Sequence, residues 1–280
     1  MKPAYFKILL ILTSINVLCL FLSCITSNTK HASELYFAVI SNTYADSPYA
    51  DFSPRLQNSI ESINKDNPIF LIHLGGLVCG GLKWMGITEA DLNRQYNNAL
   101  KCFSELSPIF YTVKGKSDLL NTSSVIYERY TKRKSYYSFN YGDLHFIVLD
   151  STEGNGRIYP DQRKWLIEDL KKNKNSGTIY VFINSVLFLP EKYSSFEEYR
   201  LKDYKLLHKY FTEYNIKAVF SGDLPFYFKY DVDGISYINT GCCGFNNNED
   251  DIPKDCIQYY IVEINKGYLD IKPRYVSCRK

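Results

Sequence analysis

The order of strand-like and helix-like segments is the feature that most constrains the fold of this chain. Residues 34–41 alternate β-branched and aromatic residues as a strand does, whereas residues 54–64 place Leu56, Ile60 and Ile63 on one helical face. From residue 226 to residue 276 only strand-like runs remain, separated by glycine-containing turns. This order predicts an α/β fold in which two mixed β-sheets pack as a sandwich flanked by helices.

The same patterns predict the individual elements. Expected helices cover 54–64, 89–105, 161–172 and 199–214. Expected strands cover 34–41, 69–74, 109–113, 136–141, 144–150, 178–183, 217–221, 226–231, 235–239, 257–264 and 268–276. Functional residues of such sheets lie on loops that follow the strands, so the loops that begin near Asn42, Gly75, Gly115, Asn184 and Gly222 are the candidates.

Composition and charge narrow the class of protein. Hydrophobic residues make up 45% and charged residues 22% of the 280 residues, which indicates a globular core. The formal net charge is +3, and it falls to +1 without residues 1–23. A near-neutral body gives no electrostatic reason to expect nucleic acid as a partner.

The N-terminus carries a targeting signal. Lys2 and Lys7 precede an apolar run at residues 8–22. This run is short for a membrane span and typical of a signal-peptide core. The run ends at Ser23-Cys24, which resembles a bacterial lipobox, so Cys24 is the predicted lipidation site. Ordinary cleavage nearby and an uncleaved anchor are the alternatives. All three predict an exported protein of the bacterial cell envelope, lipid-anchored, periplasmic or secreted.

These signals divide the chain into a signal segment at 1–24, a linker at 25–34 and one domain at 35–280. Six cysteines follow Cys24, and none forms a Cys-x-x-Cys pair, so a structural zinc site is not expected. Their pairing is not determined by the sequence.

An ordered set of segments carries a family resemblance. The segments are FAVIS at 37–41, FLIHLG at 70–75, FYTVKG at 110–115, GDLHFIVLDS at 142–151, QRKWL at 162–166, VFSG at 219–222 and YINTG at 237–241. In this order and spacing they resemble the calcineurin-like metallophosphoesterases, in the branch that includes purple-acid-phosphatase-like proteins. The resemblance covers residues 35–265, and it implies the αββα sandwich already expected from the pattern.

The resemblance also implies a chemistry. Members of the family use two divalent metals, which clamp a phosphate and activate a hydroxide between them. At the positions of the seven usual ligands and of the acid that protonates the leaving group, this chain has other residues, and only the non-ligand Asp118 agrees with the family pattern. The vestigial pocket is therefore expected to consist of Asn42, Tyr44, Gly76, Lys116, Ser117, Asp118, Asn184, Asp223 and Pro225.

The replacements predict a catalytically inactive relative. Gly76 stands where a carboxylate would bridge both metals, Lys116 where an asparagine would bind metal, and Ser117 where a histidine would protonate the leaving group. We therefore expect no catalytic residue and no resident metal, with weak calcium binding by Asn42, Asn184 and Asp223 as an alternative.

We expect the inactive chain to act as a binding or interaction module, and two other functions are alternatives. One is a residual metal-dependent phosphoesterase with nonstandard ligands, and the other is a purely structural envelope lipoprotein. The expected partner of the module is an unidentified protein or a small anionic ligand. Lys116 is expected either to pair with Asp223 or Asp118, or to bind a small anion.

Overall fold

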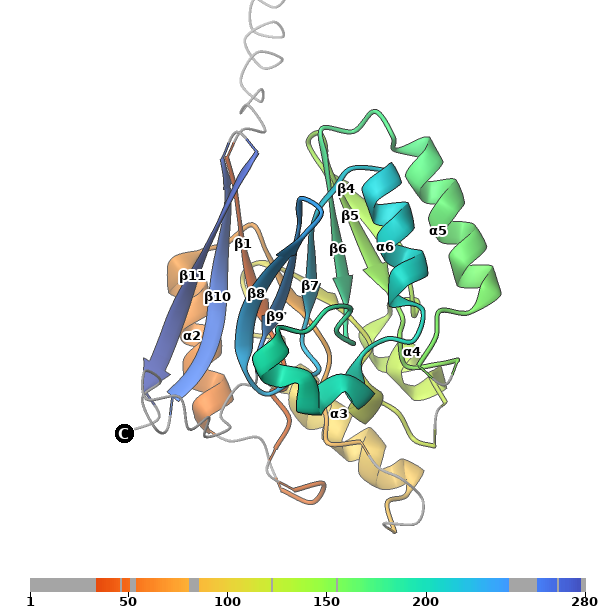
Figure 1. Ribbon diagram of the computed structural model, residues 1–280. Helices are drawn as coiled ribbons and strands as arrows, with labels where there is room; N and C mark the ends of the chain where they lie inside the picture. Colours follow the sequence, from red (N-terminus) through yellow and green to blue (C-terminus); the bar gives the residue numbers. More distant parts are fainter. Residues whose placement is uncertain are drawn as a thin grey trace, which may run out of the picture.

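The computed structural model describes residues 34–45, 47–50, 54–80, 86–121, 123–154, 156–241, 256–265 and 267–277. Two β-sheets pack face to face, and helices cover their outer faces (Figure 1). The predicted α/β sandwich is confirmed. The predicted signal segment and linker lie outside the described residues, except Glu34, which begins the first strand.

The first sheet has five strands in the order β11-β10-β1-β2-β3. β1 runs parallel to β2, which runs parallel to β3, whereas β10 and β11 form an antiparallel hairpin beside β1. The parallel strands end at the same edge of the sheet, which brings their following loops together. The bounds are β1 Glu34–Ile40, β2 Phe70–His73, β3 Ile109–Thr112, β10 Cys256–Asn265 and β11 Tyr268–Ser277.

The second sheet has six strands in the order β4-β5-β6-β7-β9-β8. The four inner strands are parallel, and β4 and β8 are antiparallel edge strands. The bounds are β4 Tyr137–Tyr141, β5 Leu144–Leu149, β6 Thr178–Ile183, β7 Ile216–Ser221, β8 Tyr227–Val232 and β9 Ile235–Thr240.

Helices cover the outer face of each sheet. The helices α2 Pro54–Asp66, α3 Glu89–Phe103 and α4 Val125–Thr131 share an apolar cluster with the first sheet. The helices α5 Pro160–Lys172 and α6 Tyr204–Glu213 share one with the second sheet. In the described part of the chain, no helix combines the length and apolar character needed to cross a membrane.

Strand periodicity explains how three apolar layers form. Along β1, Phe37 and Val39 point into the layer between the sheets, and Ala38 and Ile40 point to the helices on the other side. All four side chains are buried, because successive residues of a strand face opposite sides and both sides are covered. Phe37 stacks on Phe70 with ring centroids 4.8 Å apart, at the centre of the inner layer.

Most predicted elements lie where the pattern placed them, but three short segments differ. Helix α4 and the two 3-10 segments, η2 Lys116–Asp118 and η3 Glu191–Tyr199, were not predicted. The predicted helix at 199–214 was wrong in its first turn, because the α-helix begins at Tyr204. Leu201 is buried, and its amide donates to the Val186 carbonyl at 2.9 Å, so a contact distant in sequence holds this stretch outside the helix.

Candidate functional site

The loops that follow β1, β2 and β6 meet at the carboxyl edge of the two sheets. The Asn42 amide donates to the Gly75 carbonyl at 2.9 Å, and the Asn184 side chain donates to the Leu74 carbonyl at 2.8 Å. The Asn42 side-chain amide reaches the Gly222 carbonyl, in the loop after β7, at 2.6 Å. The structure therefore brings together the loops that the sequence singled out, and it does so through direct hydrogen bonds.

Asp118 ties the loop after β3 to the loop after β2. One carboxylate oxygen accepts from the amides of Leu77 at 2.7 Å and Val78 at 3.2 Å. The other oxygen accepts from the amides of Gly76 at 3.0 Å and Gly115 at 2.8 Å. Burial raises the pKa of Asp118 to about 6, although these four donors favour the charged form. These four hydrogen bonds fix the loop that carries Asp118 against the loop after β2.

Gly75 and Gly76 leave no space for a side chain at the position where the family resemblance implies a bridging carboxylate. Gly76 has φ +76°, and a Cβ there would lie 2.4 Å from Asn42 Oδ1 and 2.9 Å from Asn42 Cα. Gly75 has φ +98°, and a Cβ there would lie 2.6 Å from Asn184 Nδ2. Only glycine tolerates both the positive φ and the close approach. The side chains of Asn42 and Asn184 therefore occupy the space that a ligand side chain would need.

Lys116 and Asp223 form an ion pair across this edge. Lys116 Nζ lies 2.8 Å from Asp223 Oδ2, and 5.6 Å from the ring centroid of Tyr199, which ends η3. The Lys116 side chain is 49% exposed and that of Asp223 is 14% exposed, so water screens the pair. Of the pairings expected from the sequence, the structure shows the one with Asp223; anion binding by Lys116 stays a prediction.

The remaining predicted residues lie at the periphery of the same edge. Tyr44 is half-buried, and its amide donates to the Gly76 carbonyl at 3.2 Å. Ser117 is half-buried within η2, and Pro225 is half-buried in the turn between β7 and β8. All nine residues of the predicted vestigial pocket thus fall within the five loops.

These residues do not fit a two-metal centre. Among the seven ligand positions, only Asp223 carries a carboxylate, and that carboxylate already pairs with Lys116. Within the described ranges, no three His, Cys, Asp or Glu side chains are placed to hold a metal ion. The buried Asn184 Oδ1 has no hydrogen-bond partner in that same part of the chain, and a single neutral oxygen does not replace the missing anionic ligands.

His73 illustrates why the histidines of the chain do not supply the missing ligands. It is buried in β2, where Nδ1 accepts from the Gly75 amide at 3.2 Å and Nε2 lies 2.9 Å from Thr43 Oγ1. Burial lowers the pKa of His73 to about 3, so the ring is neutral at physiological pH. Both ring nitrogens are used by protein groups, which gives His73 a structural role.

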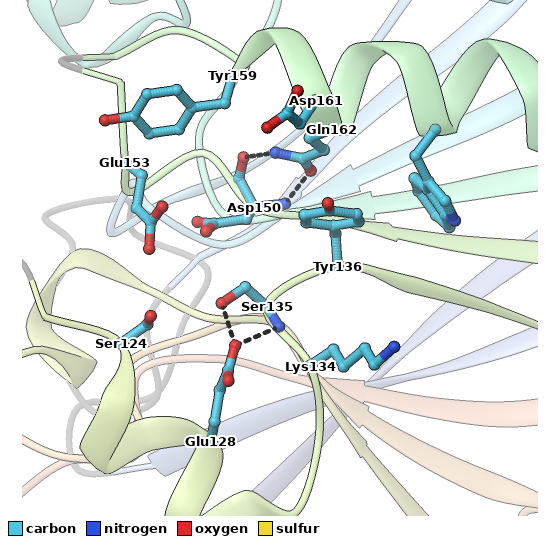
Figure 2. A pocket seen from close by; sticks show the side chains of 11 residues that line it. Ser124, Glu128, Lys134, Ser135, Tyr136, Asp150, Glu153, Tyr159, Asp161 and Gln162 are labelled. Carbon is cyan, nitrogen blue, oxygen red and sulfur yellow. Dashed lines mark hydrogen bonds between the residues drawn. The ribbon is translucent and has the colours of Figure 1, made fainter.

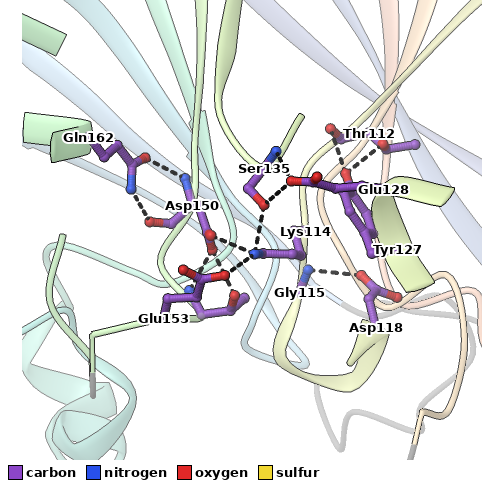
Figure 3. A network of polar contacts seen from close by, with 11 residues as sticks. Thr112, Lys114, Gly115, Asp118, Tyr127, Glu128, Ser135, Asp150, Glu153 and Gln162 are labelled. Carbon is purple, nitrogen blue, oxygen red and sulfur yellow. Dashed lines mark hydrogen bonds and ion pairs between the residues drawn. The ribbon is translucent and has the colours of Figure 1, made fainter. Parts of the chain in front are cut away.

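Sequence reasoning missed a buried polar network beside this edge (Figure 3). Lys114 is 0% exposed, and its Nζ lies 2.6 Å from Asp150 Oδ2, 3.0 Å from Glu153 Oε1 and 2.8 Å from Ser135 Oγ. The available signal was a lysine in an otherwise apolar strand end, YTVKG, followed later by the aspartate that ends LHFIVLD. A lysine in such a run predicts a buried partner of opposite charge.

Comparisons with known proteins agree on the fold. Neither a protein-family model nor a curated protein sequence matches the chain. A dimetal phosphatase from Danio rerio has a similar structure, with a TM-score of 0.66 at 10% sequence identity, covering 88% of this chain and 99% of the phosphatase. GAP50, the anchor in the inner membrane complex of Plasmodium, has a TM-score of 0.52 at 14% identity, covering 89% of this chain and 86% of GAP50. The chain therefore has the fold of the calcineurin-like metallophosphoesterases.

Proposed function

We propose that this chain is a catalytically inactive protein with a phosphoesterase fold, which acts as a binding or interaction module at the cell envelope. The observation that carries the proposal is the ion pair between Lys116 and Asp223. Both residues stand at positions where the family resemblance implies metal ligands. An ammonium group at such a position repels divalent cations, and its pairing with Asp223 neutralises the one carboxylate that could attract them.

The packing around Gly76 supports the same proposal. A bridging carboxylate would need a side chain at this position, and Asn42 occupies that space with both its backbone and its side chain. Ser117 further lacks an ionisable group that could protonate a leaving group, and such acid catalysis is worth roughly 10²–10⁴ in rate. A metal bound elsewhere in these loops would therefore meet a site without its usual acid.

The comparison with GAP50 supports a role in attachment. That protein is described as an anchor in a membrane complex, so a chain with this fold can serve an assembly. Here the apolar run at 8–22 and the following Cys24 provide a means of export and membrane attachment. We therefore assign the module to the outside of a membrane, held there by its N-terminal lipid or anchor.

One observation favours a second candidate, a residual metal-dependent phosphoesterase. The buried Asn184 Oδ1 lacks a hydrogen-bond partner among the described residues, and an amide oxygen is a ligand that calcium accepts. Asn42 and Asp223 would supply the other oxygens, provided that the Asn42 amide, whose nitrogen donates to the Gly222 carbonyl, turns its oxygen to the metal and that Asp223 leaves Lys116. This rearrangement is the reason why the inactive module is the better supported of the two.

Metal content and hydrolysis, measured on one sample, distinguish the candidates. The full chain is purified in detergent, incubated separately with manganese, iron, zinc and calcium, desalted and analysed for bound metal. Hydrolysis of bis(4-nitrophenyl) phosphate is followed on the same fractions, with the Lys116→Asn variant as a matched test of the ammonium. We expect negligible bound metal and no turnover above buffer for both proteins. About two equivalents of metal with metal-dependent turnover would overturn the proposal.

A further inference from the structure

A pocket of about 670 Å³ lies between α4 and α5, beside the ends of β4 and β5 (Figure 2). Ligand sites for small molecules have volumes of about 300–1,000 Å³, so the hollow is of a suitable size. Its lining shares no residue with the vestigial pocket at the five loops. The pocket is therefore a separate feature of the molecule, which the family chemistry does not explain.

The lining of the pocket has an excess of acidic groups. Glu128, Asp150, Glu153 and Asp161 line it, with Lys134 as the cation among the lining residues. The buried Lys114, which is not a lining residue, contacts both Asp150 and Glu153. Two lysines thus accompany four carboxyl groups, and within the described ranges the side chain of Asp161 forms neither an ion pair nor a hydrogen bond.

Aromatic rings form part of the walls. Tyr136 and Trp165 lie with ring centroids 5.0 Å apart at an angle of 53°, and both line the pocket. Tyr159, which is 49% exposed, lies on the same side as Asp161 in Figure 2. An aromatic face attracts a cation, and the attraction grows as the cation loses its water.

The hydrogen bonds inside the pocket show which groups remain available to a ligand. The Gln162 side chain already forms two hydrogen bonds with the backbone of Asp150. Its oxygen accepts from the Asp150 amide at 2.7 Å, and its nitrogen donates to the Asp150 carbonyl at 2.9 Å. One oxygen of Glu128 accepts from the amide and the hydroxyl of Ser135, at 3.0 and 2.8 Å. The Asp161 carboxylate, in contrast, has both oxygens available, so the pocket offers acceptors to a ligand that brings donors.

We propose that this pocket binds a small organic cation, an ammonium group on an apolar body. The ammonium donates to Asp161 and compensates the acidic excess, and the apolar body packs on Tyr136 and Trp165. A bare metal ion is a poorer fit, because none of the acidic side chains belongs to a described group of three or more that could hold a metal. An anion is disfavoured by the same charges that attract an ammonium.

This site does not depend on whether the chain hydrolyses phosphoesters. Bound metal with metal-dependent turnover would overturn the proposed inactivity, but it would not bear on the cation site. Absence of ammonium binding would overturn the cation site, but it would not bear on the proposed inactivity. If both proposals hold, small organic cations are a class of ligand for the interaction module.

Three probes with one apolar body and different charges test the site. 2-Phenylethylammonium, 2-phenylethanol and phenylacetate are titrated into the full chain, and binding is measured by calorimetry and by ligand-observed NMR. We expect the ammonium to bind with a dissociation constant of about 1 mM, and the alcohol about ten-fold more weakly or not at all. Added salt should weaken the binding of the ammonium, because it screens the attraction between charges. Equal affinity for ammonium and alcohol, preference for phenylacetate, or no binding of the ammonium would each overturn the proposal.

Two variants and one control locate the binding. Asp161→Asn keeps the size of an exposed side chain and should weaken ammonium binding about five-fold, and Trp165→Leu about three-fold. The control is Asp231→Asn on β8, an exposed aspartate 4.0 Å from Lys229, which should leave the affinity unchanged. If Asp161→Asn, folded by circular dichroism, bound the ammonium as tightly as the original chain, or if the control weakened binding equally, the site would be wrong.

Discussion

Lys114 and Lys116 are two residues apart in the loop after β3, yet their ion pairs lie in different environments. Lys114 is fully buried and contacts Asp150, Glu153 and Ser135, whereas Lys116 is 49% exposed and contacts Asp223. A buried ammonium has lost its water, so each partner replaces a hydration contact; an exposed ammonium keeps most of its water. We therefore expect the buried network to contribute more to the stability of the fold. The exposed pair mainly determines the charge of the vestigial pocket.

Removal of the buried lysine should have the largest effect. Lys114→Met leaves the carboxylate of Asp150 without its cation in the interior, and breaking a buried pair in this way costs about 3–5 kcal/mol. Urea unfolding followed by circular dichroism measures the loss. The double variant Lys114→Met/Asp150→Asn should recover part of it, because it removes the unpaired charge. A loss under about 1 kcal/mol for the single variant would show that water reaches Asp150 and that the comparison fails.

A methyl group at Gly76 should have the next largest effect. Gly76→Ala combines a positive φ with a contact 2.9 Å from Asn42 Cα, and the two strains together should cost about 2–4 kcal/mol. Gly234→Ala is the matched control, since it has φ +80° and a Cβ there meets no described atom within 4 Å. The control should lose about 1 kcal/mol in the same urea experiment. If the two variants lost the same free energy of unfolding, Asn42 would have moved to make space for the side chain at position 76.

His73 extends the comparison to a buried group that has no counter-charge. Its pKa of about 3 in the folded chain lies below the ordinary histidine pKa of 6.5, so the unfolded chain takes up the proton first as the pH falls. Stability is therefore lost below pH 6.5, by about 2 kcal/mol at pH 5, and His73→Gln should remove this part of the slope.

Unfolding at pH 7 and pH 5 isolates the histidine as a difference between the two proteins. Asp118 acts in the opposite direction, because its pKa is raised to about 6 and the folded chain binds its proton more tightly between pH 6 and 4. Asp118 is common to both proteins, so its contribution cancels. An unchanged slope in His73→Gln would show that the ring is already protonated or solvated in the folded chain.

Loss of the exposed pair should have the smallest effect. Lys116→Ala should change the free energy of unfolding by less than about 1 kcal/mol, because the pair is partly solvated. Asp223→Asn serves as the reciprocal control and should have an effect of similar size. A loss close to that of Lys114→Met would contradict the distinction between the two lysines. Binding of inorganic phosphate by the original chain and not by Lys116→Ala would establish the anion site that stays a prediction here.

The sequence predicted the fold more fully than the site. Alternating apolar residues, such as Phe37, Ala38 and Val39, are a local signal that survives in the folded sheet, because both faces of the strand are buried. The short helix α4 has a weaker local signal, since its seven residues start with two β-branched residues, and packing of Ile126 and Tyr127 against the first sheet holds it in place.

At the site, the sequence showed which residues had changed but not how their side chains are arranged. The Lys116–Asp223 pair joins residues 107 positions apart, and the sequence left Asp223, Asp118 and a small anion open as partners of Lys116. The sequence did not predict the network of Lys114 or the pocket beside it, because their residues come from five segments that have no common motif.

The sequence by itself determined the α/β pattern, the five loops and the residue types at the positions where the family resemblance implies metal ligands. Those properties depend on local periodicity and on residue chemistry, both of which can be read along the chain. The tertiary structure decided that Asn42 and Asn184 occupy the space beside Gly75 and Gly76, that Lys114 is buried while Lys116 is exposed, and that an acidic hollow lies between α4 and α5. Burial and charge pairing depend on distances between residues far apart in the sequence, and only the packing of the two sheets and their helices sets those distances.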